Sequence, residues 1–276
     1  MKALDAVVTP IHKEGHMFIA IFLFVAFLLF LISEPLGWIG LLLTAWCMYF
    51  FRDPERVVPK TKGVLVSPAD GMVSAVKSVI PPVELNMGDK PRVRITVFLS
   101  VFDVHVNRVP AAGEITESVY VPGEFISAAD DDAGERNERQ LLRMTTEEGH
   151  DIAFSQVAGL IARRILCDVE VGQSLNRGDK FGLIRFGSRN DIYLDEGMEA
   201  LVEVGQTMIG GETVIAKVVK KAAAKKAPAK KSVAAKAPVK KVAEKKPTMK
   251  KATAKKATAK KAPAKKASTK KPSVKK

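Results

Sequence analysis

The chain has 276 residues and a formal net charge of +14, a length that allows one or two folded domains. Residues 217–276 hold 24 lysines and one acid, Glu244, so this segment carries +23 and the rest of the chain −9. The basic total is therefore no reason to class the folded part as a nucleic-acid-binding protein. The only two cysteines, Cys47 and Cys167, lie outside any CxxC or Cys/His pattern, so they support neither a disulfide framework nor a zinc site and fit a reducing compartment.

The first predicted element is an apolar run over residues 17–33, seventeen residues without a charge, at the lower limit for crossing a bilayer. A shorter apolar run covers residues 38–51, and the Glu-Pro-Leu-Gly segment at 34–37 is expected to reverse the chain between them. A signal peptide would have a shorter apolar core and a small-residue cleavage site. Neither run has the polar face of a helix in a soluble core. We therefore expect residues 1–51 to form a membrane-associating helical hairpin.

Basic residues flank this hairpin on both sides, and the connector between its two runs has none. The positive-inside rule then places both ends in the cytoplasm, so the folded domain is expected on the cytoplasmic face of the cell (plasma) membrane. The pattern leaves open whether the hairpin spans the bilayer or only enters it. The basic residues before and after the hairpin are Lys2, Lys13, Arg52, Arg56, Lys60 and Lys62.

Residues 52–216 show short runs of Val, Ile and Phe bounded by Gly, Pro and Asp, which is typical of strands. The predicted fold class is α+β, mainly β, with a domain long enough to bury a substantial core. Residues 155–166 are ambiguous between strand and helix, because their apolar run includes helical spacing. Examples of the expected strands are 63–66, 72–79, 93–100, 113–121, 151–157, 180–186 and 200–204.

Within the domain, residues 66–73 read as strand, tight turn and strand, with Pro68 suited to the second turn position and Gly71 to a positive φ. The stretch that includes Lys77 also looks somewhat like the hairpin of a lipoyl or biotinyl domain. One alternative interpretation is therefore a non-enzymatic, membrane-tethered carrier or polyanion-binding scaffold with Lys77 as the modified residue.

The basic segment at 217–276 repeats Lys-Lys at intervals of five residues, which advance about 140° around a helix and so leave no apolar face. With five prolines it has the composition of a disordered polycation. It can bind anionic lipid head groups, at about 1 kcal/mol for each basic residue near the surface. Nucleic acid and no dedicated partner are the alternatives. We favour lipid, because the chain is already held at a membrane.

The chemically informative segment is residues 181–194, FGLIRFGSRNDIYL, in which Gly187 precedes Ser188. A serine hydroxyl can attack the adjacent glycyl carbonyl in a strained backbone, since glycine has no Cβ to block it. The resulting ester can eliminate to dehydroalanine, which hydrolyses to a pyruvoyl group at a new N-terminus. A Gly-Ser pair alone is no signal, because most are simple bends.

This segment resembles the short bacterial and archaeal type of phosphatidylserine decarboxylase, which cleaves itself at the Gly-Ser of an FGSR motif. Further blocks similar to the family occur in family order over residues 51–194. They are FRDP at 51–54, SPADG at 67–71, FLSVFDVHVNRVP at 98–110, NER at 137–139 and QVAGLIARR at 156–164. The basic tail lies outside the resemblance.

Self-cleavage needs a base near Ser188, and His105 is the natural candidate because its pKa suits neutral pH. The resemblance implies that Asp70 of the SPADG turn is the acid that orients His105 in an Asp-His-Ser triad. Asp103 is a rival for that role, since on a strand it would share a face with His105. His150, the other histidine of the domain, lies in a polar turn pattern and is expected to be exposed.

Three arginines are candidate ligands of the substrate phosphate or carboxylate: Arg108, Arg185 and Arg189. A solvated strand-edge cation is the alternative for each. Arg108 also marks a departure, because longer relatives with an LGST site carry a second histidine there. The role of that second histidine would be taken here by His105, or partly by Arg108 or a water.

The resemblance thus implies a proenzyme that cleaves between Gly187 and Ser188 into a large β chain, 1–187, and a small α chain, 188–276. The pyruvoyl group from Ser188 would form a Schiff base with phosphatidylserine and release CO₂ and phosphatidylethanolamine, without pyridoxal phosphate or a metal. Membrane lipids are implied partners, and a homo-oligomer is left open. A second alternative, a pyruvoyl decarboxylase of a soluble amino acid, gives no reason for the apolar hairpin.

Overall fold

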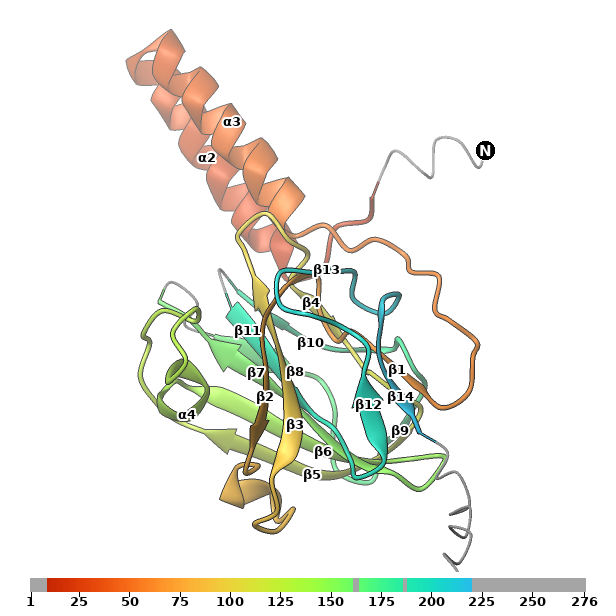
Figure 1. The fold of residues 1–276 in the computed structure, drawn as a ribbon. Helices are drawn as coiled ribbons and strands as arrows, with labels where there is room; N and C mark the ends of the chain where they lie inside the picture. The colour runs from red at the N-terminus through yellow and green to blue at the C-terminus, as the bar shows by residue number, and fades with distance from the viewer. Residues whose placement is uncertain (1–8, 161–163, 186–187, 220–276) are drawn as a thin grey trace, which may run out of the picture. The chain divides into compact units, whose positions relative to one another are not determined.

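The computed structural model describes residues 9–160, 164–185 and 188–219. The predictions for Gly187 and for the tail beyond residue 219 lie outside this range. The expected class is confirmed: an apolar helical hairpin precedes a domain made mainly of strands (Figure 1).

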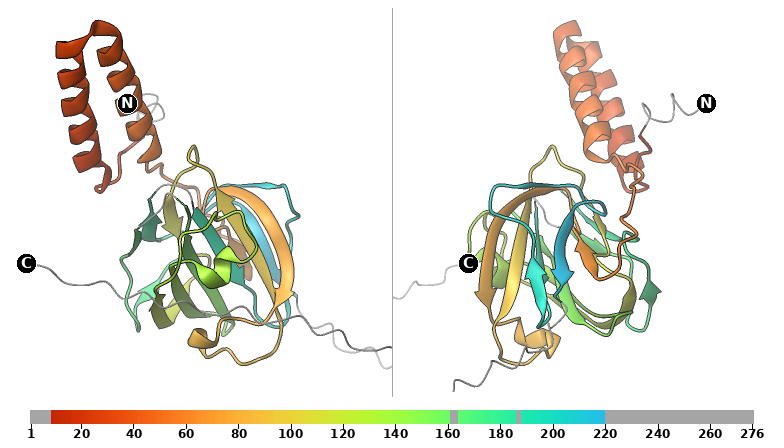
Figure 2. Two further views of the ribbon diagram at one scale, coloured as in Figure 1. Left: turned by 90° about the vertical axis from the view of Figure 1, so that its left-hand side faces the viewer. Right: turned by 45° about the vertical axis from the view of Figure 1, so that its right-hand side comes forward.

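The hairpin consists of α2, Gly15–Ile32, and α3, Glu34–Phe50. The two helices lie side by side and antiparallel (Figure 2), and Gly40 packs so closely on Ala26 that a Cβ would meet its Cα at 2.7 Å. Large apolar side chains such as Leu31 and Leu42 are about 70% exposed on the outer faces. In the described part of the chain, only α2 is long and apolar enough to cross a membrane, judged by length and composition.

The predicted chain reversal at 34–37 is wrong in its position. Ser33 alone connects the helices, in an extended conformation, and Glu34 already begins α3. Pro35 lies in the first turn, where a helix needs no backbone N–H from it and where its fixed φ is already helical. The proline therefore starts the second helix instead of separating the two.

The domain contains fourteen described strands, one short α-helix and one 3-10 helix. The bounds are β1 Val64–Val66, β2 Gly71–Val79, η1 Val83–Leu85, β3 Arg92–Leu99, β4 Val106–Arg108, β5 Gly113–Val121, α4 Ala133–Arg136, β6 Arg139–Thr146, β7 Asp151–Ala158, β8 Ile165–Cys167, β9 Ser174–Leu175, β10 Lys180–Ile184, β11 Ser188–Tyr193, β12 Met198–Ala200, β13 Thr207–Met208 and β14 Val214–Val218.

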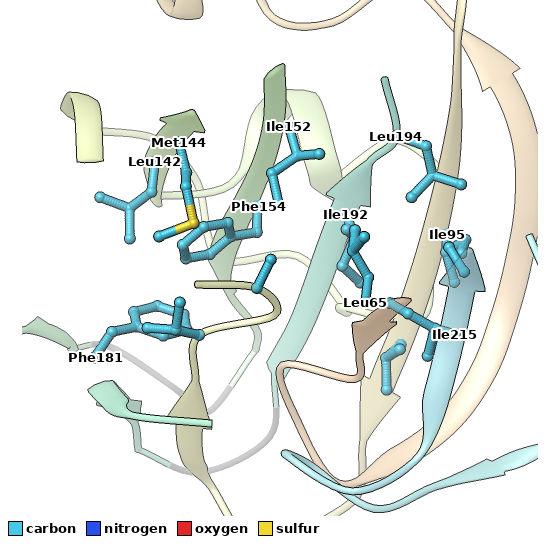
Figure 3. Packing of buried hydrophobic residues seen from close by; sticks show 14 of the residues in the cluster. Leu65, Ile95, Leu142, Met144, Ile152, Phe154, Phe181, Ile192, Leu194 and Ile215 are labelled. Carbon is cyan, nitrogen blue, oxygen red and sulfur yellow. The ribbon is translucent and has the colours of Figure 1, made fainter. Parts of the chain in front are cut away.

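Antiparallel pairing joins these strands into three sheets. An eight-stranded sheet has the order β13-β2-β3-β11-β7-β6-β5-β9, and two three-stranded sheets have the orders β1-β14-β12 and β4-β10-β8. The main core gathers apolar side chains from all three sheets (Figure 3), among them Phe154 and Ile192 of the large sheet, Ile215 of β14 and Phe181 of β10. Strands far apart in the sequence are thus neighbours, with β11 between β3 and β7.

Most of the expected strands are present with shifts of one or two residues, but 200–204 is wrong. There β12 ends at Ala200, and a turn follows. The ambiguous 155–166 stretch is the end of β7, a connection and the start of β8. The strands that were not named include β6, β11 and β14. β11 has polar residues at four of its six positions, which no apolar alternation reveals.

The predicted hairpin at 66–73 is also wrong. β1 pairs with β14, whereas β2 pairs with β3 and β13, so the SPADG turn carries the chain from one sheet to another. Lys77 lies inside β2, where its ammonium pairs with Asp131 at 2.7 Å, and not at the tip of a hairpin as a carrier lysine would require. The structure gives the carrier interpretation no support.

Gly71, the last residue of the SPADG turn, begins β2 and packs tightly against β3. Its φ is +144°, and a Cβ would overlap the main-chain oxygen of Phe98 on β3. We expect Gly71→Ala to lower the free energy of unfolding by about 3 kcal/mol, the sum of backbone strain and overpacking, in thermal unfolding of the purified protein. Gly88→Ala is the matched control: φ is +76° with no atom within 4 Å, so the backbone cost of about 1 kcal/mol remains alone. Equal losses in the two variants would contradict this account.

Candidate active site

Ser188 is the first residue of β11, and it pairs with Leu99 of β3 on one side and with Ala158 of β7 on the other. Its side chain is completely buried, and its Oγ has no hydrogen-bond partner among the described residues. A buried hydroxyl normally has one, since leaving it unpaired costs about 1–3 kcal/mol. The serine that sequence reasoning selected is therefore held in an unusual environment.

His105 lies between β3 and β4 and is also fully buried. Its main-chain oxygen accepts a hydrogen bond from Ile184 N–H, at the end of the strand that leads toward Ser188. Leu99, the last residue of β3, is opposite Ser188, and Ile184, the last residue of β10, bonds to His105. Ser188 and His105 therefore both lie where these two strands end.

The ring of His105 contacts the main chain of Asp103 and the ring of Phe50. Nδ1 is 2.9 Å from the main-chain oxygen of Asp103, and the ring centroid is 4.3 Å from that of Phe50, the last residue of α3. A carbonyl oxygen only accepts hydrogen bonds, so Nδ1 carries the proton in this contact and Nε2 of the neutral ring carries the lone pair. This tautomer can accept a proton at Nε2.

Burial lowers the pKa of His105 to about 4, against the opposing effects of the Asp103 carbonyl and carboxylate, and nearby Arg52 lowers it further. His105 is therefore neutral at pH 7, as a general base must be. Its environment favours the base form over the charged form.

Asp70 makes its described contacts with Arg56 and not with His105. Arg56 Nη2 donates to both carboxylate oxygens, at 2.9 and 2.8 Å, and Gly210 N–H donates to Oδ1 at 2.7 Å. Burial raises the pKa of Asp70, and the Arg56 charge opposes this. The Asp103 charge raises the pKa of both Asp70 and His105, so the three groups share one neighbourhood. The triad role of Asp70 stays a prediction.

Asp103 does not share a strand with His105, because both lie in the connection that precedes β4. Its carboxylate accepts the N–H of Ser100 at 2.7 Å and so closes that turn. Its main-chain oxygen, not its carboxylate, meets the imidazole. The prediction that His150 is exposed is wrong: it is partly buried, with Nδ1 3.3 Å from Asp195.

The three candidate arginines lie in different surroundings. Arg108 is buried and donates to Gly178 O at 3.0 Å and Pro54 O at 2.9 Å, which joins two distant loops. Arg189 is 2% exposed and pairs with Asp191 at 2.9 Å, and it lies on the face of β11 opposite to Ser188. Both are fully engaged by protein groups. Their substrate-binding roles stay predictions.

Arg185 lies three positions before Ser188 along the chain, and it contacts the membrane hairpin. Its guanidinium pairs with Glu14, next to the start of α2, and lies 5.2 Å from the centroid of the Phe18 ring. Phe50 and Phe51 also pack on Val104, Val106 and Leu183 of the domain. The hairpin thus reaches the surroundings of both His105 and Arg185.

Sequence reasoning missed six residues of this region: Glu14, Phe50, Arg56, Asn107, Gln156 and Asn190. Gln156 and Asn107 occur within blocks that carry the family resemblance, which was the one available signal. Partners such as Glu14 and Arg185 are 171 positions apart, so no local pattern joins them.

Comparison with known proteins gives a consistent result. The profile of the phosphatidylserine decarboxylase family matches residues 43–216. The phosphatidylserine decarboxylase proenzyme of Cereibacter sphaeroides is 54% identical over 220 residues, covering 80% of this chain and 95% of the relative. The proenzyme of Ruegeria pomeroyi is 53% identical over 216 residues, covering 78% and 99%, and that of Rickettsia felis 49% identical over 224 residues, covering 81% and 97%.

Proposed function

Because the chain belongs to the phosphatidylserine decarboxylase family, it is a carboxy-lyase of phosphatidylserine, and we propose that it acts through a pyruvoyl group made from its own Ser188. The group would form when the chain cleaves itself between Gly187 and Ser188. When present, this group would supply an electron-withdrawing carbonyl for the amine of the head group and for the charge left as CO₂ departs.

The observation that carries this proposal is the Ser188 hydroxyl, which is fully buried and has no partner among the described residues. Conversion to a pyruvoyl group removes this hydroxyl, so a site built for the product has no need of a hydrogen bond to Oγ. The residues present therefore fit the group. In the precursor, the hydroxyl has no hydrogen bond to any described residue that attack on the neighbouring carbonyl would have to break.

His105 acts as the base in this proposal. Its neutral ring, with the proton on Nδ1 and the lone pair on Nε2, can take the proton of the Ser188 hydroxyl. The Asp103 carbonyl then stabilises the charged ring through the Nδ1–H that it already accepts. Asp70, held by Arg56, contributes its charge to this neighbourhood as the predicted acid of the family triad.

The strand pairing supports a product of two chains that stay together. The small chain would hold β11, β12, β13 and β14, and three of these pair with strands of the large chain: β11 with β3 and β7, β13 with β2, and β14 with β1. β10 and β11, on either side of the cleavage site, belong to different sheets. The bond that is cut therefore lies between two sheets and inside no strand.

A lipid substrate fits the contacts of the hairpin better than a soluble amino acid does. α2 is apolar enough to span a bilayer, and the hairpin contacts His105 through Phe50 and Arg185 through Glu14. A head group at the membrane surface would then lie next to the reacting residues. With both flanks basic, the proposed location is the cytoplasmic face of the cell membrane, where the basic tail can bind anionic lipids.

The direct test is the intact mass of freshly purified full-length protein. We expect two chains, residues 1–187 and 188–276, with a small chain that reacts with hydroxylamine. A single active 276-residue chain without a reactive carbonyl would refute the pyruvoyl mechanism while leaving the family membership untouched.

Arg185 is the arginine best placed to bind the substrate carboxylate or phosphate, because its partner Glu14 can be exchanged for another anion. We expect Arg185→Gln to raise KM for phosphatidylserine in mixed micelles about 10- to 100-fold, the worth of one charge-assisted hydrogen bond, with the extent of self-cleavage unchanged. Glu14→Gln is the matched control, since it frees the guanidinium and should not raise KM. Equal increases in both variants would show that the pair only holds the hairpin in place.

A further inference from the structure

Three buried amide side chains lie on the same side of the large sheet as Ser188. Asn190 follows Ser188 by two positions on β11, so both side chains point to the inner face, as does Ile192 in the main core. Gln156 of β7 is directly opposite Asn190, and Gln156 Nε2 donates to Asn107 Oδ1 of β4 at 2.8 Å. All three amides are completely buried.

Much of the hydrogen-bonding capacity of this amide cluster (Asn107, Gln156 and Asn190) is unused. The unpaired atoms among the described residues are Asn107 Nδ2, Gln156 Oε1, and both Nδ2 and Oδ1 of Asn190. With Ser188 Oγ they make five buried polar atoms without a partner. At about 1–3 kcal/mol each, such a group is expensive unless a small polar molecule fills it.

The residues around the amide cluster hold the Gln156 side chain in one orientation. Both donors of Gln156 are committed, one to Asn107 and the other to Leu166 O at 3.0 Å, which leaves Oε1 as an acceptor. Gly182 of β10 permits this, because a Cβ there would overlap Leu166 O and come within 2.8 Å of Gln156 Nε2. On its other side Asn190 faces Val97, which offers no polar side chain.

The dimensions match a single water next to residue 188. Two residues along a strand separate Cα atoms by about 7 Å, a span that one water can bridge with two hydrogen bonds of about 3 Å. A buried water needs two to four polar partners, and Asn190 and Gln156 offer a donor and two acceptors on facing strands.

We propose that the amide cluster is the binding site for the water that converts residue 188 into its carbonyl form. This inference rests on the proposed self-processing. After the ester eliminates, residue 188 is CH₂=C(NH₂)–, which isomerises to CH₃–C(=NH)–. Water adds to that carbon, its oxygen becomes the carbonyl oxygen, and the nitrogen leaves as ammonia. Because Ser188 is completely buried, this water must be held inside the protein.

The cluster therefore acts after the chain has been cut. Severing the chain consumes no water, since the attack of the hydroxyl and the elimination are both internal. Substitutions of the residues that hold the water are expected to change the rate of carbonyl formation and not the rate of cleavage. A difference between these two rates distinguishes residues that position the water from residues that only support the fold.

The test uses Asn190→Val and Asn190→Thr in the full-length chain, made by cell-free synthesis in detergent micelles. The two residues are both β-branched and nearly equal in shape, and only threonine keeps a hydroxyl that can hold a water. Cleavage is followed by electrophoresis, and carbonyl formation by hydrazide labelling together with ammonia release.

In Asn190→Val we expect cleavage at the wild-type rate, with carbonyl formation and ammonia release about tenfold slower, the kinetic equivalent of one lost hydrogen bond. Asn190→Thr should recover most of that rate. The valine variant should remain folded, because it replaces two buried polar atoms with apolar atoms and leaves no unpaired polar group at position 190.

Three results would overturn the inference: carbonyl formation that keeps pace with cleavage in Asn190→Val, an equal delay in both variants, or a folded Asn190→Val that is not cleaved. The last would place Asn190 in the severing step. A wild-type chain that never gains a carbonyl would instead refute the proposed function itself, so the two failures are distinguishable.

Discussion

Ser188→Ala is expected to remain one chain of 276 residues, to give no product with carbonyl reagents and to have no measurable decarboxylase activity. Alanine lacks the hydroxyl that attacks the Gly187 carbonyl, so neither cleavage nor a pyruvoyl group can follow. The fold should persist, because Oγ has no hydrogen-bond partner to lose among the described residues, and a buried unpaired oxygen is replaced by hydrogen. Intact mass, hydroxylamine labelling and CO₂ release measure the three effects.

The matched control is Ser174→Ala, in the short strand β9 at the edge of the large sheet, where the serine is exposed. This variant should process and decarboxylate as wild type does. A Ser188→Ala protein that is cut between residues 187 and 188, or that releases CO₂ from phosphatidylserine, would contradict the assignment of Ser188.

His105→Gln is expected to slow self-cleavage by about 10²- to 10⁴-fold, the usual contribution of a general base. In the wild type, the rate of cleavage should stay level from pH 7 to about pH 5 and fall as the pH drops through about 4, where the lone pair on Nε2 becomes protonated. An ordinary histidine would lose activity near pH 6.5. Cell-free synthesis followed by a pH jump and electrophoresis provides the measurement.

The same pKa predicts how stability depends on pH. Because the folded-state pKa of about 4 lies below the unfolded value of 6.5, the unfolded chain binds more protons between these two values. The free energy of unfolding should therefore decrease as the pH falls from 6.5 to about 4, and His105→Gln should flatten this decrease. His150→Gln, at a partly buried site beside Asp195, is the control and should cleave at the wild-type rate. A cleavage midpoint near pH 6.5 would contradict a buried, neutral base.

The local patterns of the chain were sufficient for the broad features. The apolar runs predicted the hairpin, and alternating apolar residues predicted strands such as β2, β3 and β5, because burial of one face imposes a period of two. β11 was missed since its first two inward positions carry Ser188 and Asn190, polar residues where an alternating strand has apolar ones. The outward Arg189 and Asp191 satisfy each other as an ion pair, so the first four residues of the strand are all polar.

The predicted triad shows that residue types alone do not predict which group contacts the catalytic imidazole. Motifs selected Ser188, His105 and Asp70, but the contact to His105 Nδ1 comes from the Asp103 carbonyl, and Asp70 is bound by Arg56. A main-chain oxygen is the same in every residue, so no sequence pattern distinguishes the one that orients an imidazole. The turn closed by the hydrogen bond from Ser100 N–H to the Asp103 carboxylate sets which main-chain oxygen meets His105.

By itself, the sequence determined the hairpin, the mainly β class and, through its motifs, the family and the reacting serine, because these depend on residue types and on periodicity along short stretches. Only the tertiary structure decided that Arg185 meets Glu14, that Phe50 covers His105, and that Asn107, Gln156 and Asn190 gather beside Ser188. The physical reason is that antiparallel register between distant strands brings these side chains together. That register is a property of the packed sheets as a whole, and no single segment contains it.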